Sequence, residues 1–141
     1  MIEAERVLLA PREDVWALVS EPYHLPDWWP AYTGVTPDRR GLSPNARWRV
    51  SRSRASGLLR RPGGEGLIVI TEVDEGFALS WHDVAQRLDA GIALANVGQG
   101  RTRATAHVSG ASWRLLVEGA RGQPERALTR LHDLCQTATA L

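Results

Sequence analysis

Apolar and polar residues alternate along several segments of the chain, a pattern typical of strands that bury one face. The clearest case lies between residues 45 and 55, where Ala46, Trp48 and Val50 share one face and arginine or serine residues occupy the other. Residues 67–74 are rich in β-branched side chains, which also favours a strand. Strands are therefore predicted over residues 2–10, 32–38, 45–55, 67–74, 77–86, 88–96 and 101–110, with a loop at 56–66 and a hairpin connection at 98–100.

Other segments place apolar residues at helical spacing. Residues 12–20 follow a proline and carry acidic residues in their first turn, both of which favour the start of a helix. A shorter helix is predicted around residues 23–29, which a proline closes. A long C-terminal helix begins at Ser112, is interrupted by Gly119, Gly122 and Pro124, and continues as an apolar stripe to the end of the chain.

The order of these elements predicts an α+β fold in a single domain of residues 1–141. An antiparallel sheet of about six to seven strands would carry its helices on one face, with two short helices after the first strand. A long helix lying across a curved sheet need not fill the space beneath it. We therefore expect a cavity between the sheet and the C-terminal helix.

Composition narrows the class of protein only a little. The chain has 141 residues, 43% of them hydrophobic, and a formal net charge of +1, so its overall charge indicates no partner. Its single cysteine, Cys135, fits a reducing compartment, and no signal peptide or membrane span is recognisable. We expect a cytoplasmic protein without a bound metal or cofactor.

Two consecutive segments carry a family resemblance. Residues 10–20 read Ala-Pro-Arg-Glu-Asp-Val-Trp-Ala-Leu-Val-Ser, and residues 21–30 read Glu-Pro-Tyr-His-Leu-Pro-Asp-Trp-Trp-Pro. Both resemble the start of the polyketide cyclase/dehydrase branch of the START/Bet v1-like (SRPBCC) superfamily. Weaker matches are the strand-turn-strand at 72–81 and the hairpin at 100–105. The resemblance implies a helix-grip fold, a curved sheet wrapped around a long C-terminal helix, but no universal catalytic motif.

The same resemblance implies that the inward faces meet around a cavity that binds a small apolar or aromatic ligand. Tryptophan suits such a wall because it offers a large apolar surface and one N–H donor, and the chain has six. Simple core packing is the alternative for these residues. The candidate ligand-binding residues are Trp28, Trp29, Trp48, Val50, Val69, Thr71, Leu79, Trp81, Trp113 and Val117.

An enzymatic role, as a polyketide cyclase or dehydratase, is the second hypothesis. Arg52 shares strand parity with Trp48, so it can reach inward as a counter-charge, and Tyr32 or His82 could act as an acid. No histidine pair has the spacing of a zinc site, and exposed positions are the plainer interpretation of all four histidines.

The third hypothesis is a protein-interaction module. Arginine is dense between Arg39 and Arg61, a region that could dock an acidic carrier protein. A solvated sheet face is the plainer interpretation. Nucleic-acid binding is not expected, because the net charge is low and no known binding module is recognisable. The oligomeric state is not predicted.

Overall fold

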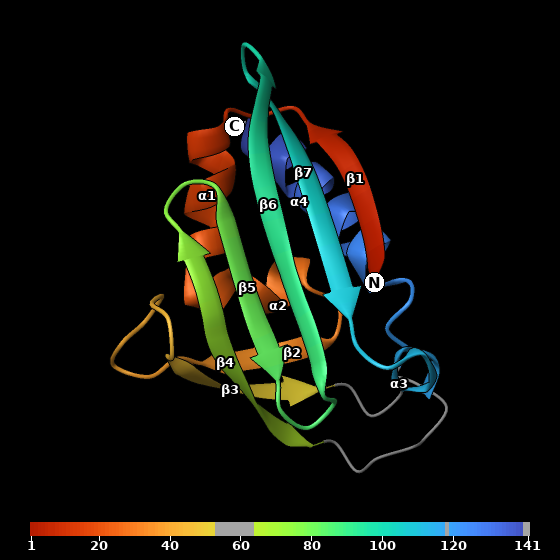
Figure 1. The fold of residues 1–141 in the computed structure, drawn as a ribbon. Coiled ribbons are helices and arrows are strands. Elements are labelled where there is room, and N and C mark those ends of the chain that lie inside the picture. Colours follow the sequence, from red (N-terminus) through yellow and green to blue (C-terminus); the bar gives the residue numbers. More distant parts are fainter. Residues whose placement is uncertain (53–63, 118, 140–141) are drawn as a thin grey trace.

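The computed structural model describes residues 1–52, 64–117 and 119–139, and its centre is one antiparallel sheet (Figure 1). The sheet has seven strands in the order β1-β7-β6-β5-β4-β3-β2, so the first strand pairs with the last. The strands are β1 (Ile2–Leu8), β2 (Tyr32–Thr36), β3 (Arg47–Arg52), β4 (Glu65–Asp74), β5 (Ala78–Asp83), β6 (Leu88–Gly98) and β7 (Arg101–Ser109). The predicted number and direction of strands are confirmed.

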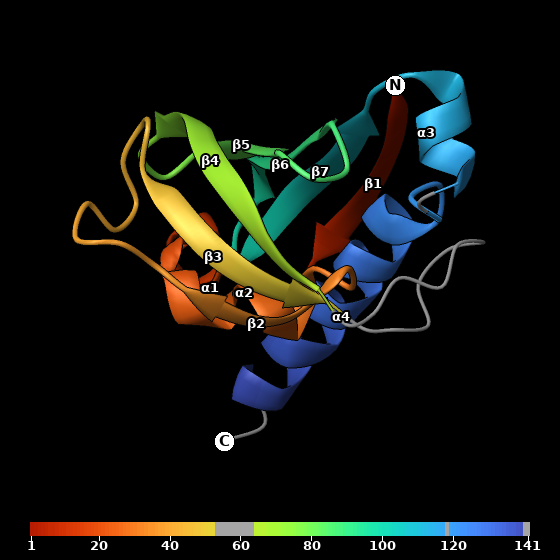
Figure 2. The same cartoon turned by 90° about the horizontal axis from the view of Figure 1, so that it is seen from below.

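Most of the helical residues lie on the concave side of the sheet (Figure 2). In Figure 2 the sheet arcs over α1, α2 and α4. The helical elements are α1 (Arg12–Ser20), the 3-10 helix η1 (Pro22–His24), α2 (Leu25–Trp28), α3 (Ser112–Val117) and α4 (Gln123–Thr139). Together with the sheet they form the predicted helix-grip architecture.

Strand alternation places the core between these two layers. Trp48 and Val50 of β3, like the even-numbered residues from Thr102 to Val108 of β7, are buried as their parity predicts. The inner stripe of α4 packs against β1 and β7 and closes the core from the other side. Its buried members are Ala127, Leu128, Leu131 and Cys135.

The prediction for β4 chose the wrong face. Ile68 and Ile70 are fully buried, whereas Val69 is only half-buried and Thr71 is exposed. The strand register explains this difference. Ile68 pairs with Trp48, which lies on the inner face of β3, and not with either of the solvent-facing arginines of that strand. Val69 and Thr71 therefore lie on the outer face. Successive apolar residues in this strand hide the alternation that fixed the faces of the other strands.

The predicted C-terminal helix is two helices, and this moves Trp113 away from the core. Gly119 adopts a left-handed conformation (φ +67°) after α3, and the chain restarts as α4 at Gln123. Trp113 on α3 is 59% exposed and stacks with Arg114, whose guanidinium lies 4.5 Å from the indole centroid. The prediction that Trp113 lines the interior is wrong. Val117 lies at the end of α3, and its side chain is outside the described part of the structure.

None of the described helices is long and apolar enough to cross a lipid bilayer.

Candidate functional site: a buried polar network among tryptophans

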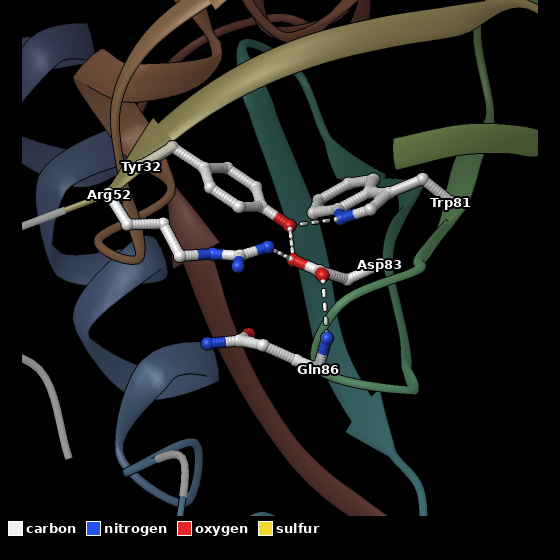
Figure 3. Close-up of polar contacts among 5 residues, drawn as sticks. All are labelled: Tyr32, Arg52, Trp81, Asp83 and Gln86. Carbon is white, nitrogen blue, oxygen red and sulfur yellow. Dashed lines mark hydrogen bonds and ion pairs between the residues drawn. The ribbon is translucent and has the colours of Figure 1, made fainter. Parts of the chain in front are cut away.

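A buried carboxylate lies at the end of β5, where the alternation of Leu79 and Trp81 continues inward to Asp83. Asp83 is 2% exposed. Its Oδ2 atom accepts hydrogen bonds from the Tyr32 hydroxyl, at 2.8 Å, and from the Arg52 guanidinium. Its Oδ1 atom accepts the backbone N–H of Gln86 at 3.0 Å, which fixes the turn after the strand. Three elements of the sheet thus converge on one carboxylate (Figure 3).

Tyr32 is the first residue of β2, directly after the short helices, and only 3% of it is exposed. Its hydroxyl donates to Asp83 and accepts a hydrogen bond from the Trp81 indole N–H at 3.1 Å. Burial, followed by the negative charge of Asp83, raises the pKa of Tyr32 well above its usual value. Tyr32 is therefore a neutral donor at physiological pH and is unsuited to act as a base.

Arg52 ends β3 and turns inward, the direction that its parity with Trp48 and Val50 predicts. Its side chain is 11% exposed, and its guanidinium carbon lies 5.8 Å from the centroid of the Tyr32 ring. The ion pair with Asp83 balances the buried charge. The Nε atom of Arg52 is buried and has no hydrogen-bond partner among the described residues.

Three tryptophans pack edge to face beside this network. Ring centroids lie 5.9 Å apart for Trp28 and Trp29, 5.9 Å for Trp28 and Trp81, and 5.1 Å for Trp29 and Trp81. Each is at most 1% exposed. The Trp81 indole N–H is satisfied by Tyr32, whereas that of Trp28 has no partner among the described residues. Among the described residues, four buried side-chain nitrogens lack a hydrogen-bond partner, and two of them, Trp28 Nε1 and Arg52 Nε, belong to this network and its packed tryptophans.

The structure separates the predicted site residues that lie on the inner side of the sheet from His82, which lies on the outer side. Tyr32 and Arg52 meet at Asp83, with Trp28, Trp29 and Trp81 beside them. Trp48, Val50 and Leu79 are buried on the same inner face of the sheet, and the Trp48 indole N–H donates to the Gly41 carbonyl at 2.7 Å. His82 points away from all of them, because it is on the outer face of β5. There its Nδ1 atom lies 2.9 Å from Asp89 Oδ1.

The central residue of the network, Asp83, was not predicted from the sequence. The signal was available, because Asp83 shares the parity of Leu79 and Trp81, the two residues that defined the inner face of β5. Gln86 shares the strand parity of His82 on the outer face but is buried, because β5 ends at Asp83 and alternation no longer applies beyond it.

The arginine-rich region contributes one residue to the interior and several to the surface. Arg39, Arg40, Arg47 and Arg49 are exposed. Asp38 sits among them, and hydrogen bonds from backbone N–H groups, that of Arg47 first, lower the pKa of its carboxyl group. The other arginines of the region, Arg54, Arg60 and Arg61, lie outside the described residues. Docking of a carrier protein here stays a prediction.

Within the described ranges, no group of three or more histidine, cysteine, aspartate or glutamate side chains is placed to hold a metal ion.

A curved antiparallel sheet around a C-terminal helix defines the helix-grip class of fold (Figure 2). The particular family follows from the sequence match. Residues 1–136 match the family described as polyketide cyclase/dehydrase and lipid transport, and the chain belongs to this family. The predicted resemblance is confirmed.

Solved structures support the same fold. Protein NE0264 from Nitrosomonas europaea superposes with a TM-score of 0.71 at 20% identity, covering 99% of this chain and 96% of that one. A START superfamily protein from Mycobacterium smegmatis gives a TM-score of 0.71 at 13% identity, with 97% of each chain covered. DynU16, from the dynemicin biosynthetic locus, superposes with a TM-score of 0.67 at 19% identity. The superposition covers 97% of this chain and 47% of DynU16. No curated protein matches the sequence.

Proposed function

We propose that the chain binds a small aromatic or apolar molecule between the sheet and the helices, and that this ligand carries an acceptor oxygen. Carrying, sequestering or sensing such a molecule would all use the same site. The family and the fold support ligand binding in general. The tryptophans and the polar network support the more specific chemistry.

The observation that carries the proposal is the pair of buried donors, Trp28 Nε1 and Arg52 Nε, without acceptors among the described residues. A buried polar group without a partner costs about 1–3 kcal/mol, so native interiors rarely contain one without a reason. A ligand carbonyl, phenol or carboxylate oxygen would supply the acceptor. The three tryptophan rings beside it would offer an aromatic molecule edge and face contacts.

Native mass spectrometry of freshly purified protein, followed by denaturation and identification of released molecules, is the first test. A bound aromatic or acyl compound would support the proposal and identify its class. Protein that is reproducibly empty is then titrated with 2-acetylnaphthalene and 2-ethylnaphthalene, which differ in one carbonyl, while tryptophan fluorescence is recorded. We expect the ketone to bind about tenfold more tightly, as one well-made hydrogen bond would produce.

Two arginines of one strand provide a matched comparison. Arg52→Gln should remove the preference for the ketone, because it removes the inward guanidinium. Arg47→Gln changes an exposed arginine of β3 and should leave the preference intact. Absence of binding by both compounds, or equal binding with no effect of Arg52→Gln, would refute the proposal.

A second candidate, an enzyme that dehydrates or cyclises a ketone-bearing substrate, is favoured by the convergence of Tyr32, Arg52 and Asp83. The Tyr32 hydroxyl would exchange its hydrogen bond to Asp83 for one to a substrate oxygen, and Arg52 would stabilise the developing negative charge. Loss of water from an aromatic β-hydroxy ketone can be followed by absorbance. Tyr32→Phe and Arg52→Gln should slow turnover by about 100-fold, and His82→Asn should not. No turnover above the buffer rate would leave binding as the function.

A further inference from the structure

An open groove lies on the outside of the molecule, where α1 and the C-terminal part of α4 approach each other. Its volume is about 450 Å³, within the range of small-molecule sites. Figure 2 shows the last turns of α4 extending past α1 and α2, away from the sheet. The groove is lined by Leu9, Ala10, Pro11, Asp14, Ala17, Leu18, His24, Leu134 and Cys135. It shares no residue with the interior network or the three packed tryptophans.

The walls of this groove are apolar, and its polar groups are few. Leu9, Leu18 and Leu134 contribute aliphatic side chains to the wall, and Cys135, which is 6% exposed, also lines it. The remaining polar side chains are His24, which is held by Asp27 at 3.0 Å, and Asp14. None of the described residues that line the groove is an arginine.

The charge that faces the groove is therefore negative. Asp14 is exposed in the first turn of α1, and no described ion pair involves it. The neighbouring cation, Arg12, is turned away: it donates to the Gly76 carbonyl at 2.7 Å and lies over the Phe77 ring. After burial, the negative charge of Asp14 also raises the pKa of the Cys135 thiol, so the field of this carboxylate reaches the groove wall.

We propose that this groove is a second binding site, for a small molecule with an aliphatic body and a protonated amine. The aliphatic chain would lie against the leucines, and the ammonium group would pair with Asp14 at the rim. A carboxylate ligand of the same length would instead meet Asp14 as a like charge. The two sites differ in charge preference, because the interior offers unpaired donors and the groove offers an acceptor.

Cys135 provides a readout confined to this site, because it is the only cysteine of the chain. The experiment measures the rate at which a thiol reagent labels Cys135 in the presence of octylamine, octanol or octanoate. Octylamine should slow labelling to a given extent at a concentration about fivefold lower than octanol requires, because an exposed ion pair would add to its affinity. Octanoate should be the weakest of the three.

Two carboxylates of one helix turn distinguish the charge effect from a general one. Asp14→Asn should make octylamine and octanol equivalent, whereas Glu13→Gln, which does not line the groove, should preserve the amine preference. Ala17→Trp, at an exposed position of the groove, should block protection by all three compounds. Arg52→Gln should change none of these results, so failure here is separable from failure of the interior site.

Three outcomes would overturn the proposal. One is labelling of Cys135 that none of the compounds slows. Another is equal protection by octylamine and octanoate in the unmodified protein. The third is an amine preference that survives Asp14→Asn.

Discussion

Asp83 shows how one buried residue can determine the chemistry of an interior. Its carboxylate accepts hydrogen bonds from a hydroxyl, a guanidinium and a backbone N–H, so each partner is held in one orientation. Removing this charge would leave the Arg52 guanidinium, which is 11% exposed, without its counter-charge. A buried charge that loses its partner is costly, because water cannot reach it to compensate.

Asp83→Asn should therefore lower the free energy of unfolding by about 3 kcal/mol or more. Asp89→Asn is the matched control, because Asp89 pairs with His82 on the outer face, where the aspartate is 59% exposed. An exposed pair contributes about 0–1 kcal/mol. Urea unfolding followed by circular dichroism measures both variants. Equal losses would contradict the role assigned to Asp83.

Tyr32 predicts a specific loss of stability in alkaline solution. The pKa of Tyr32 is raised in the folded protein, so the folded state holds this proton when the unfolded state has released it. Stability from this group is complete below the unfolded pKa of about 10 and falls as the pH rises from there toward the folded value. The loss approaches about 1.4 kcal/mol per pH unit.

Tyr32→Phe, which cannot ionise, isolates this effect. The difference in unfolding free energy between the unmodified protein and Tyr32→Phe should be constant from pH 7 to pH 9 and fall above about pH 10. Urea titrations at each pH measure it. A difference that does not change with pH would show that Tyr32 ionises equally in both states.

Strand parity predicted part of this site because it depends only on alternation along the chain. It identified the inward direction of Arg52 and the inner face containing Trp48 and Trp81. It could not predict that Tyr32, Arg52 and Asp83 meet, because that depends on the register of β2 with β3 and on the curvature of the sheet. Pairing across strands is not encoded in the periodicity of any one of them.

At the scale of elements, α1 and the turn between β4 and β5 connect the helical layer to the sheet. Arg12 of α1 donates to the Gly76 carbonyl and stacks on the Phe77 ring at 4.1 Å. The Trp16 indole N–H donates to Glu75 Oε1 at 3.1 Å. Gly76 is left-handed, with φ +85°, which brings its carbonyl within reach of the helix.

Arg12→Ala should destabilise the protein by about 1–2 kcal/mol, because it removes a hydrogen bond by a charged donor together with the stacking contact. Arg103→Ala is the control, since the ion pair of Arg103 with Glu5, at 3.1 Å, is exposed to solvent. Its loss should stay below about 1 kcal/mol. Thermal unfolding of the two variants gives the comparison, and a larger effect of Arg103→Ala would rule out this role for α1.

The two errors at the scale of elements have different causes. In β4, consecutive apolar residues gave no alternation, so Val69 and Thr71 were assigned inward although Ile68 and Ile70 are the buried ones. In the C-terminal segment, helical spacing placed Trp113 on the apolar face of one long helix. The break after α3 gives this helix its own direction, and Trp113 lies in solvent.

At the scale of the whole molecule, buried residues from β1 to α4 belong to one hydrophobic cluster. A single domain stays a prediction, and it implies that the chain unfolds as one cooperative unit. Urea transitions monitored by tryptophan fluorescence and by far-ultraviolet circular dichroism should have the same midpoint and slope. Separate transitions would mean that part of the chain folds independently.

The order of the sheet has a consequence for how the protein is made. Ile2 of β1 pairs with Val108 of β7, so β1 leaves the ribosome before the strand with which it pairs has been made. At about 5–20 residues per second, that interval lasts roughly 5–20 seconds. During this time β1 has no partner strand, but it carries the charged residues Glu3, Glu5 and Arg6. These charges discourage pairing with another nascent chain while the strand awaits its partner.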